Sequence, residues 1–227
     1  MLRVAVLASG KGSNLQALLT RIAAGDVDAK VVLVVSDRPD AGALDVARGG
    51  KVPALLALPP EPGEKRTSYD ARLLEALQRE HPDLVVLAGY MRIAGPALVR
   101  AFAGRIINIH PALLPDFRGL HAVRQALAAG VERAGCTTHI VTDDLDGGPL
   151  LLQAWLRVRP GEDESSLQQR ILRLEHLVLP RTVQLFAEGR VRTEGGKASL
   201  LPGPPSSSWL ARQDLPLVSG AHYGEGF

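Results

Sequence analysis

The chain has 227 residues, enough for one large domain with its own apolar core. It carries 26 Lys and Arg against 24 Asp and Glu, so the basic excess of a typical nucleic-acid-binding protein is absent. The single Cys136 excludes an internal disulfide framework and is typical of a reducing compartment. No apolar run approaches the roughly 20 residues that span a membrane, and the N-terminus does not read as a secretory signal. We therefore expect a cytoplasmic protein with no nucleic-acid or membrane partner.

Short apolar runs alternate with longer segments of helical periodicity. The apolar runs predict strands at 2–8, 31–36, 52–57, 84–88, 105–110, 137–142 and 151–158. The intervening segments predict helices at 13–24, 40–48, 67–80, 96–102, 118–129 and 165–188. Most of the strands are continuously apolar, as expected for strands that are covered on both faces. The alternation predicts an α/β fold, a doubly wound and mostly parallel sheet of about seven strands with helices on both faces.

The composition changes near residue 195. From there the chain is rich in Gly, Pro and Ser, as in "GGKASLLPGPPSSS". We expect a single domain over residues 1–194 and a C-terminal tail over 195–227. One short strand is expected near 197–201, with the rest of the tail irregular.

The stretch "ASGKGSNLQ" at 8–16 joins the first strand to the first helix through a glycine-rich turn. Backbone N–H groups at such a helix start bind anions, so a phosphate-bearing ligand is one interpretation. A dinucleotide fingerprint with Asp37 as the ribose acid is weakened because Leu15 stands where Gly or Ala is needed. A P-loop lacks its Gly-Lys-Ser/Thr ending. A tight turn that binds no ligand remains open.

The stretch "NIHP" ends the strand at 105–110 with an amide and an imidazole two residues apart. Alternate residues of a strand share a face, so Asn108 and His110 project together at the end where ligands bind in α/β sheets. The acidic, glycine-rich loop "DDLDGG" follows the next strand, and its Asp146 is expected to approach His110. A carboxylate favours the imidazolium form. Two donors on one face could then hold an oxygen that becomes negative during acyl transfer, and His110 could also move a proton.

These residues also allow other interpretations. A histidine at a strand end is often a structural group, and that alternative stays open for His110. The loop at 142–149 lacks the glutamate and flanking helices of an EF-hand calcium site. His110, His121 and His139 have no zinc-ligand spacing. Cys136 and His139 are three residues apart on a strand and face opposite ways, which disfavours a nucleophile pair. We expect no metal site.

Taken together, "GKGSN", "GYMRI", "NIHPALLP" and "DDLDGGP" resemble the glycinamide ribonucleotide formyltransferase family over about residues 1–190. Members of that family transfer the formyl group of 10-formyltetrahydrofolate to the amine of glycinamide ribonucleotide in purine biosynthesis. The resemblance implies direct attack through a tetrahedral intermediate, with small-molecule substrates and no metal. A homodimer is compatible with the sequence.

The resemblance also assigns residues by position. It implies a catalytic trio of Asn108, His110 and Asp146. It implies that the ribonucleotide is held by Gly12, Ser13, Asn14 and Glu175. It implies that the folate is held by Arg66, Met91, Arg92, Ile93, Ala94 and Asn108. Helical spacing independently puts Glu175 on the flank of the buried stripe of its helix.

The sequence departs from the family pattern at two places. Arg118 in "PDFRG" is more typical of the methionyl-tRNA branch of the wider family, and Ala94 replaces a bulkier side chain. A methionyl-tRNA enzyme would need a large C-terminal domain, which a tail of this composition is not expected to form. A formyltetrahydrofolate hydrolase, which is expected to carry an N-terminal regulatory domain, and a non-catalytic nucleotide-binding module remain the alternatives.

Overall fold

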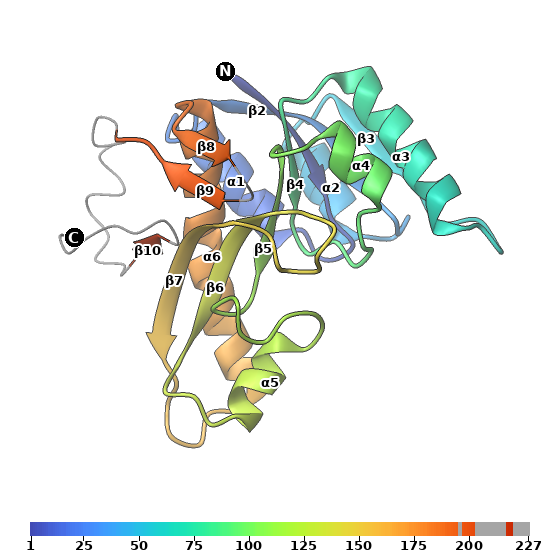
Figure 1. The fold of residues 1–227 in the computed structure, drawn as a ribbon. Helices are drawn as coiled ribbons and strands as arrows, with labels where there is room; N and C mark the ends of the chain where they lie inside the picture. Colours follow the sequence, from blue (N-terminus) through green and yellow to red (C-terminus); the bar gives the residue numbers. More distant parts are fainter. Residues whose placement is uncertain (195–196, 203–216, 220–227) are drawn as a thin grey trace.

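The computed structural model describes residues 1–194, 197–202 and 217–219, and its centre is an eight-stranded sheet (Figure 1). In the described part the strand order is β10-β7-β6-β5-β4-β1-β2-β3. The parallel strands are β1 (Leu2–Leu7), β2 (Ala29–Ser36), β3 (Ala54–Ala57), β4 (Leu84–Leu87) and β5 (Ile106–His110). The antiparallel strands are β6 (Arg133–Ile140), β7 (Leu150–Arg157) and β10 (Leu217–Ser219). The mostly parallel sheet is confirmed.

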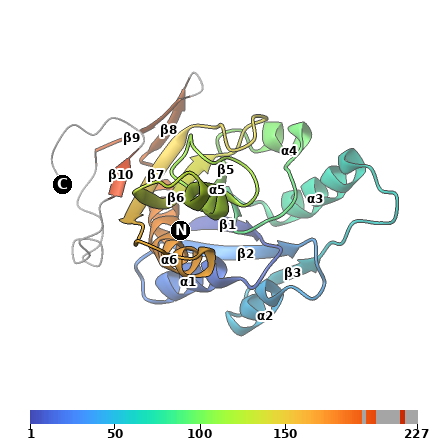
Figure 2. The same ribbon diagram turned by 90° about the horizontal axis from the view of Figure 1, so that it is seen from below.

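Helices cover both faces of this sheet (Figure 2). One face packs against α1 (Ser13–Ala23), α2 (Gly42–Gly49), α5 (Ala122–Ala128) and α6 (Glu164–Ala187). The other packs against α3 (Arg66–Glu80) and α4 (Pro96–Ala101). The side chains of β1 alternate between the two cores, since Val4 and Val6 join the first and Ala5 and Leu7 join the second. This alternation on a fully buried strand is the reason for its continuous apolar run.

The edge of the sheet where β1, β4 and β5 end carries the loops that matter for function. The chain leaves β1 toward β2 and β3 and later returns on the other side as β4, so the strand order switches between β1 and β4. A crevice opens at such a switch point because the two loops turn away in opposite directions. Here they stay linked, since Ser9 N–H donates to Gly89 O over 3.1 Å and Met91 N–H donates to Ser9 Oγ over 2.9 Å.

Several expected elements differ from the structure. The strand expected at 137–142 is β6 and lies at 133–140, and it runs antiparallel to β5. The helix expected at 118–129 is shorter in the structure, where α5 begins only at Ala122. Phe117, Gly119 and His121 before it have positive φ, which a right-handed helix does not allow. The expected strand near 197–201 is β9 (Lys197–Leu200), but it pairs with β8 (Val191–Glu194), which the sequence did not predict.

The expected irregular tail is wrong at one place, since β10 pairs with β7 and extends the main sheet. The remaining residues of the expected tail, 195–196, 203–216 and 220–227, lie outside the described residues. The division of the chain at residue 195 stays a prediction. Among the helices that the structure describes, none is long and apolar enough to cross a membrane.

One buried hydroxyl fixes the loop that follows β5. Thr137 is fully buried on β6, and its Oγ1 donates to Ala112 O over 2.6 Å. The same oxygen accepts the Leu114 N–H at 3.1 Å and a Gln153 Nε2–H at 2.9 Å. The backbone directly after His110 is therefore bound to β6 through this side chain.

We expect Thr137→Val to lower the free energy of unfolding by about 2 kcal/mol, because it leaves the buried Leu114 N–H and Ala112 C=O without partners. Valine keeps the shape of threonine, so lost hydrogen bonds dominate the change. Thr137→Ser keeps the hydroxyl and is the matched control. Urea denaturation followed by tryptophan fluorescence measures both variants. An unchanged stability of the valine variant, or an equal loss in the serine variant, would contradict the role of the hydroxyl.

Candidate active site

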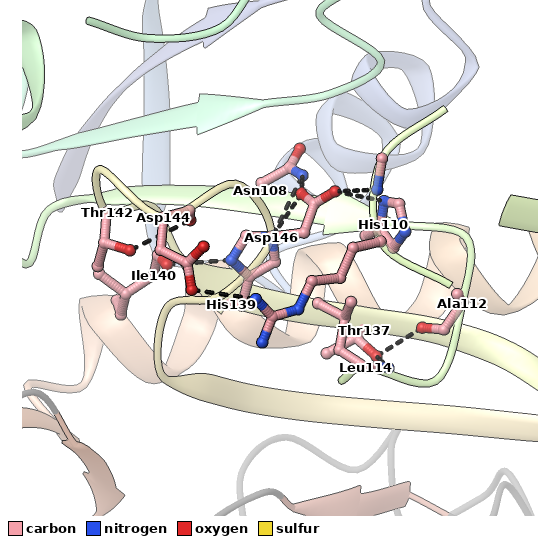
Figure 3. Close-up of polar contacts among 12 residues, drawn as sticks. Asn108, His110, Ala112, Leu114, Thr137, His139, Ile140, Thr142, Asp144 and Asp146 are labelled. Carbon is pink, nitrogen blue, oxygen red and sulfur yellow. Dashed lines mark hydrogen bonds and ion pairs between the residues drawn. The ribbon is translucent and has the colours of Figure 1, made fainter. Parts of the chain in front are cut away.

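His110 ends β5 with both ring nitrogens facing oxygen atoms. Its side chain is almost fully buried. Nε2 lies 2.9 Å from the carbonyl oxygen of Phe117, which can only accept a hydrogen bond, so Nε2 is the donor. Nδ1 lies 3.5 Å from Oδ2 of Asp146 (Figure 3). An oxygen acceptor therefore faces each of the two ring nitrogens of His110.

Asp146 is the carboxylate at the centre of the site. Its Oδ2 accepts the Gly119 N–H at 2.8 Å, and its Oδ1 lies 3.4 Å from Asn108 Nδ2. Burial alone would raise the pKa of this carboxyl. Hydrogen bonds from His139 and the Gly119 N–H, with the charges of His110 and His139, outweigh burial and lower the pKa to about 2. Asp146 is thus a carboxylate throughout the physiological pH range.

The sequence predicted the approach of Asp146 to His110, but the route of the chain is different. Because β6 is antiparallel to β5, its last residue Ile140 pairs with Ile107, near the start of β5 and away from His110. The loop after β6 must return along β5 to bring Asp146 to His110. It does so with Asp146 at φ 50°, a left-handed conformation that Asp tolerates better than most side chains.

Sequence analysis did not assign His139 to this site. His139 is 2% exposed and is paired in register with Asn108 across β5 and β6. Its Nε2 lies 3.2 Å from Asn108 Nδ2 and 3.4 Å from Asp146 Oδ1, and its Nδ1 lies 3.0 Å from Ile140 O. If β5 and β6 had been expected to pair antiparallel, His139 would have been predicted as the neighbour of Asn108. The sequence analysis expected a mostly parallel sheet and therefore missed it.

The predicted anion site lies at the start of α1. Gly12 precedes the helix with φ 80°, and a Cβ there would lie 2.6 Å from the Cα of Ala43. Glycine is thus required by the turn and by the close packing of α2. No side chain caps α1, so the first N–H groups of the helix, at Ser13 and the residues after it, have no intrahelical acceptor and can bind an anion.

Asn14 instead reaches across to α6. Its Nδ2 donates to Glu175 Oε2 over 2.7 Å, and both side chains are buried. Its Oδ1 is buried and has no hydrogen-bond partner among the described residues. Burial raises the pKa of the Glu175 carboxyl to about 7, although the Asn14 bond lowers it. A buried acceptor without a donor beside a carboxyl is a natural place for ligand hydroxyl groups.

The segment after β4 contains most of the predicted folate residues. Met91 and Ile93 are more than half exposed, and Ala94 packs on the second core. The guanidinium of Arg92 stacks 3.9 Å from the ring centroid of Tyr69 in α3. The segment therefore exposes the apolar side chains of Met91 and Ile93, while its Arg92 packs against α3.

The same part of α3 supports the end of this segment. The buried Asp70 carboxylate contacts Gly95, where a Cβ would lie 1.9 Å from its Oδ2. Burial raises the pKa of Asp70, while the charges of Arg66 and Arg92 and the Gly95 backbone lower it. Arg66 begins α3, is exposed, and acts on Asp70 through its charge. Within the described part of the chain it makes no hydrogen bond or ion pair with Asn108, His110 or Asp146.

Arg118, the departure noted in the sequence, pairs with Asp144 over 3.0 Å. The pair links the loop after β5 to the loop that carries Asp146. Both side chains are more than a third exposed, so we assign the pair little stabilising energy. Among the described residues, no group of three or more His, Cys, Asp and Glu side chains is arranged to hold a metal ion.

The chain is similar to known proteins in both sequence and fold. Residues 2–183 match the family model described as formyl transferase. Phosphoribosylglycinamide formyltransferase of Escherichia coli is 40% identical over 215 residues, which are 95% of this chain and 96% of that protein. The crystal structure of glycinamide ribonucleotide transformylase 1 from Symbiobacterium toebii is 47% identical with a TM-score of 0.84, covering 89% of this chain and 95% of that one.

A hydrolytic relative is also similar. The structure of a formyltetrahydrofolate deformylase from Pseudomonas syringae is 30% identical with a TM-score of 0.82, and the match covers 88% of this chain but 66% of that chain. The fold of this chain is therefore similar both to structures named for formyl transfer and to one named for deformylation. With the family model spanning four-fifths of its length and the trio assembled at the sheet edge, the chain belongs to the formyl transferase family.

Proposed function

We propose that the protein transfers the formyl group of 10-formyltetrahydrofolate to the amine of glycinamide ribonucleotide, in de novo purine biosynthesis. The observation that carries the proposal is the meeting of Asn108, His110 and Asp146 at the carboxyl end of β5 (Figure 3). The folate is a co-substrate, and no step in the mechanism needs a metal. The cytoplasmic location remains a prediction, and a homodimer remains compatible with the sequence.

The mechanism begins with attack of the ribonucleotide amine on the formyl carbon. The formyl oxygen becomes negative in the tetrahedral intermediate, and the imidazolium of His110 with the amide of Asn108 can hold it. In the free protein the Nε2 proton of His110 is held by Phe117 O. The loop that carries Phe117 must therefore give way before that proton serves the substrate. The intermediate collapses when a proton reaches the departing folate nitrogen, through His110 or water.

Each substrate has a binding region of matching chemistry. We assign the phosphate to the free N–H groups at Gly12, Ser13 and Asn14, since backbone donors at a helix start favour an anion. We assign the ribose hydroxyls to Glu175 and the unpaired oxygen of Asn14. The pterin is assigned to the segment Met91, Arg92, Ile93 and Ala94 with Asn108, and Arg66 is assigned to the far end of the folate.

Hydrolysis of the formyl donor is the second candidate, supported by the similarity to the deformylase. The two activities differ in the nucleophile, which is the ribonucleotide amine in one and water in the other. The bound ribonucleotide would exclude water from the formyl carbon. The Asn14–Glu175 pair favours transfer, because hydrolysis has no use for a receptor of ribose hydroxyls.

Formyl transfer should require both the ribonucleotide and His110. We expect folate absorbance to change on mixing 10-formyltetrahydrofolate with protein only when glycinamide ribonucleotide is present. His110→Ala should lower kcat by roughly 10²-fold or more, because it removes an oxyanion donor and a proton carrier. His81→Asn, at an exposed histidine that ends α3 with φ 46°, is the control and should be fully active. Folate consumption without ribonucleotide would instead establish the hydrolase.

Replacement of Asp146 should affect turnover much more than binding. Asp146→Asn keeps the shape and an acceptor for Gly119 N–H but removes the charge that favours the His110 imidazolium. We expect kcat to fall by roughly 10²-fold, the ribonucleotide KM to change by less than about threefold, and the acid side of the pH–rate profile to shift. Steady-state kinetics over pH 5–9 measures this. Asp143→Asn in the same loop is exposed and serves as the control. Unchanged turnover in Asp146→Asn would reject the role.

Glu175 should make stability depend on pH. Its folded pKa of about 7 exceeds 4.5, the ordinary value for a glutamate side chain, so the folded state binds the proton more tightly than the unfolded state. The contribution to stability is present below pH 4.5 and is lost as pH rises through 7. At about 1.4 kcal/mol per pKa unit, the loss is on the order of 3 kcal/mol.

Glu175→Gln cannot ionise and should abolish this loss. We expect the stability of the natural protein relative to Glu175→Gln to fall between pH 5 and pH 8.5 in urea denaturation. Other titrating groups are common to both proteins and cancel in the difference. A difference that stays constant with pH would show that Glu175 does not titrate in this range.

A further inference from the structure

The segment to which the pterin is assigned, residues 91–94, is held by a single backbone hydrogen bond within the described part of the chain. Met91 N–H donates to Ser9 Oγ over 2.9 Å. No other backbone N–H or C=O of these four residues is hydrogen-bonded to a described residue. The remaining backbone groups are therefore free to bind a ligand, and one hydroxyl holds the backbone that carries them.

The side chains of residues 91–94 anchor the segment only from the second core. Arg92 stacks on Tyr69 of α3, and Ala94 packs on that core. Met91 and Ile93 are 60% and 55% exposed, so their side chains add little packing. The position of the backbone relative to β1 therefore depends on the bond to Ser9.

Ser9 is the firmly held partner in this bond. It directly follows β1, which pairs with β2 on one side and β4 on the other, and it is 3% exposed. Its own N–H donates to Gly89 O over 3.1 Å. The next residue, Gly10, accepts the Ala43 N–H at 3.0 Å, which binds the same loop to α2. The Ser9 hydroxyl thus fastens a loosely held segment to a rigid strand end.

The loop that starts at Ser9 also leads to the proposed phosphate site. Gly12 lies three residues later and precedes α1. The regions assigned to the two substrates therefore meet at one side chain, whose bond to Met91 sets their separation. Transfer requires the amine and the formyl carbon at close approach, and a misplacement of about 1 Å can cost roughly 10²-fold in rate.

We infer that Ser9 is a positioning residue for the proposed formyl transfer: its hydroxyl fixes the backbone of residues 91–94 relative to the loop that binds the ribonucleotide phosphate. Ser9 acts through the Met91 N–H and does not touch the reacting atoms. The inference rests on the proposed function, because it explains how that reaction brings its two substrates into register.

The neighbouring strand offers a matched control for Ser9→Ala. Ser36 ends β2, is fully buried, and its Oγ accepts the Arg38 N–H at 3.1 Å. Ser36→Ala therefore removes the same kind of bond from a loop to which no substrate is assigned. Any general cost of losing a buried serine hydroxyl at a strand end is common to both variants.

We expect Ser9→Ala to weaken folate binding and slow turnover together. The Kd for tetrahydrofolate, measured by calorimetry, should rise roughly fivefold, because the segment must be ordered during binding. The kcat for transfer should fall roughly tenfold, because the formyl carbon is held less precisely. The ribonucleotide KM should stay within about twofold, since Gly10 remains bonded to Ala43. Ser36→Ala should leave all three quantities within about twofold.

Amide hydrogen exchange tests the bond directly in the natural protein. Met91 and Ile93 both have exposed side chains, but only the Met91 N–H is hydrogen-bonded to a described residue. After correction for intrinsic rates, we expect the Met91 amide to exchange at least about tenfold more slowly than the Ile93 amide. The difference should disappear in Ser9→Ala and persist in Ser36→Ala.

The outcomes are distinct. Unchanged Kd and kcat in Ser9→Ala, or equal losses in Ser36→Ala, would overturn the inference. Equal exchange of the Met91 and Ile93 amides in the natural protein would overturn it even if Ser9→Ala does not fold. Failure of the natural protein to transfer the formyl group would instead reject the proposed function, because that assay uses unaltered Ser9.

Discussion

The site depends on one buried carboxylate. Asp146 has oxygen contacts to the Gly119 N–H, the Asn108 amide, His110 and His139, so donors from three parts of the chain converge on it. Burying a carboxylate is costly unless its oxygens are paired, and here the pairing outweighs the cost and lowers the pKa to about 2. Moving the loop that carries Asp146 would separate its buried carboxylate from these donors, and this cost holds the loop in place.

The change of strand direction after β5 makes this convergence geometrically attainable. A parallel β6 would begin at the opposite edge and present its end beside His110, with a different residue opposite Asn108. The antiparallel β6 instead places His139 in register with Asn108 and forces the next loop to return over the site. Thr137, two residues earlier on the same strand, holds the backbone that follows His110. One strand therefore orients both sides of the trio.

The second region of the site is incomplete in a way that fits a ligand. Asn14 and Glu175 form one short hydrogen bond in a buried setting, while the other oxygen of Asn14 lacks a donor among the described residues. Burial raises the pKa of Glu175 to about 7, so the free protein holds this carboxyl near the point of proton loss. A ligand hydroxyl would supply donors and stabilise the charged form, so under the proposed function ribonucleotide binding would be coupled to release of a proton.

The amino-acid sequence by itself determined the α/β class, the parallel half of the sheet and the meeting of Asn108, His110 and Asp146 at one edge. Continuous apolar runs and strand periodicity are local signals, and they were enough for these predictions. Only the tertiary structure decided the direction of β6, the role of Asn14 and the presence of His139 in the site. The direction of a strand depends on how distant segments pair, so the local sequence pattern of β6 does not indicate it. The Asn14–Glu175 bond joins residues that are 161 positions apart, so it exists only once α1 has packed against α6.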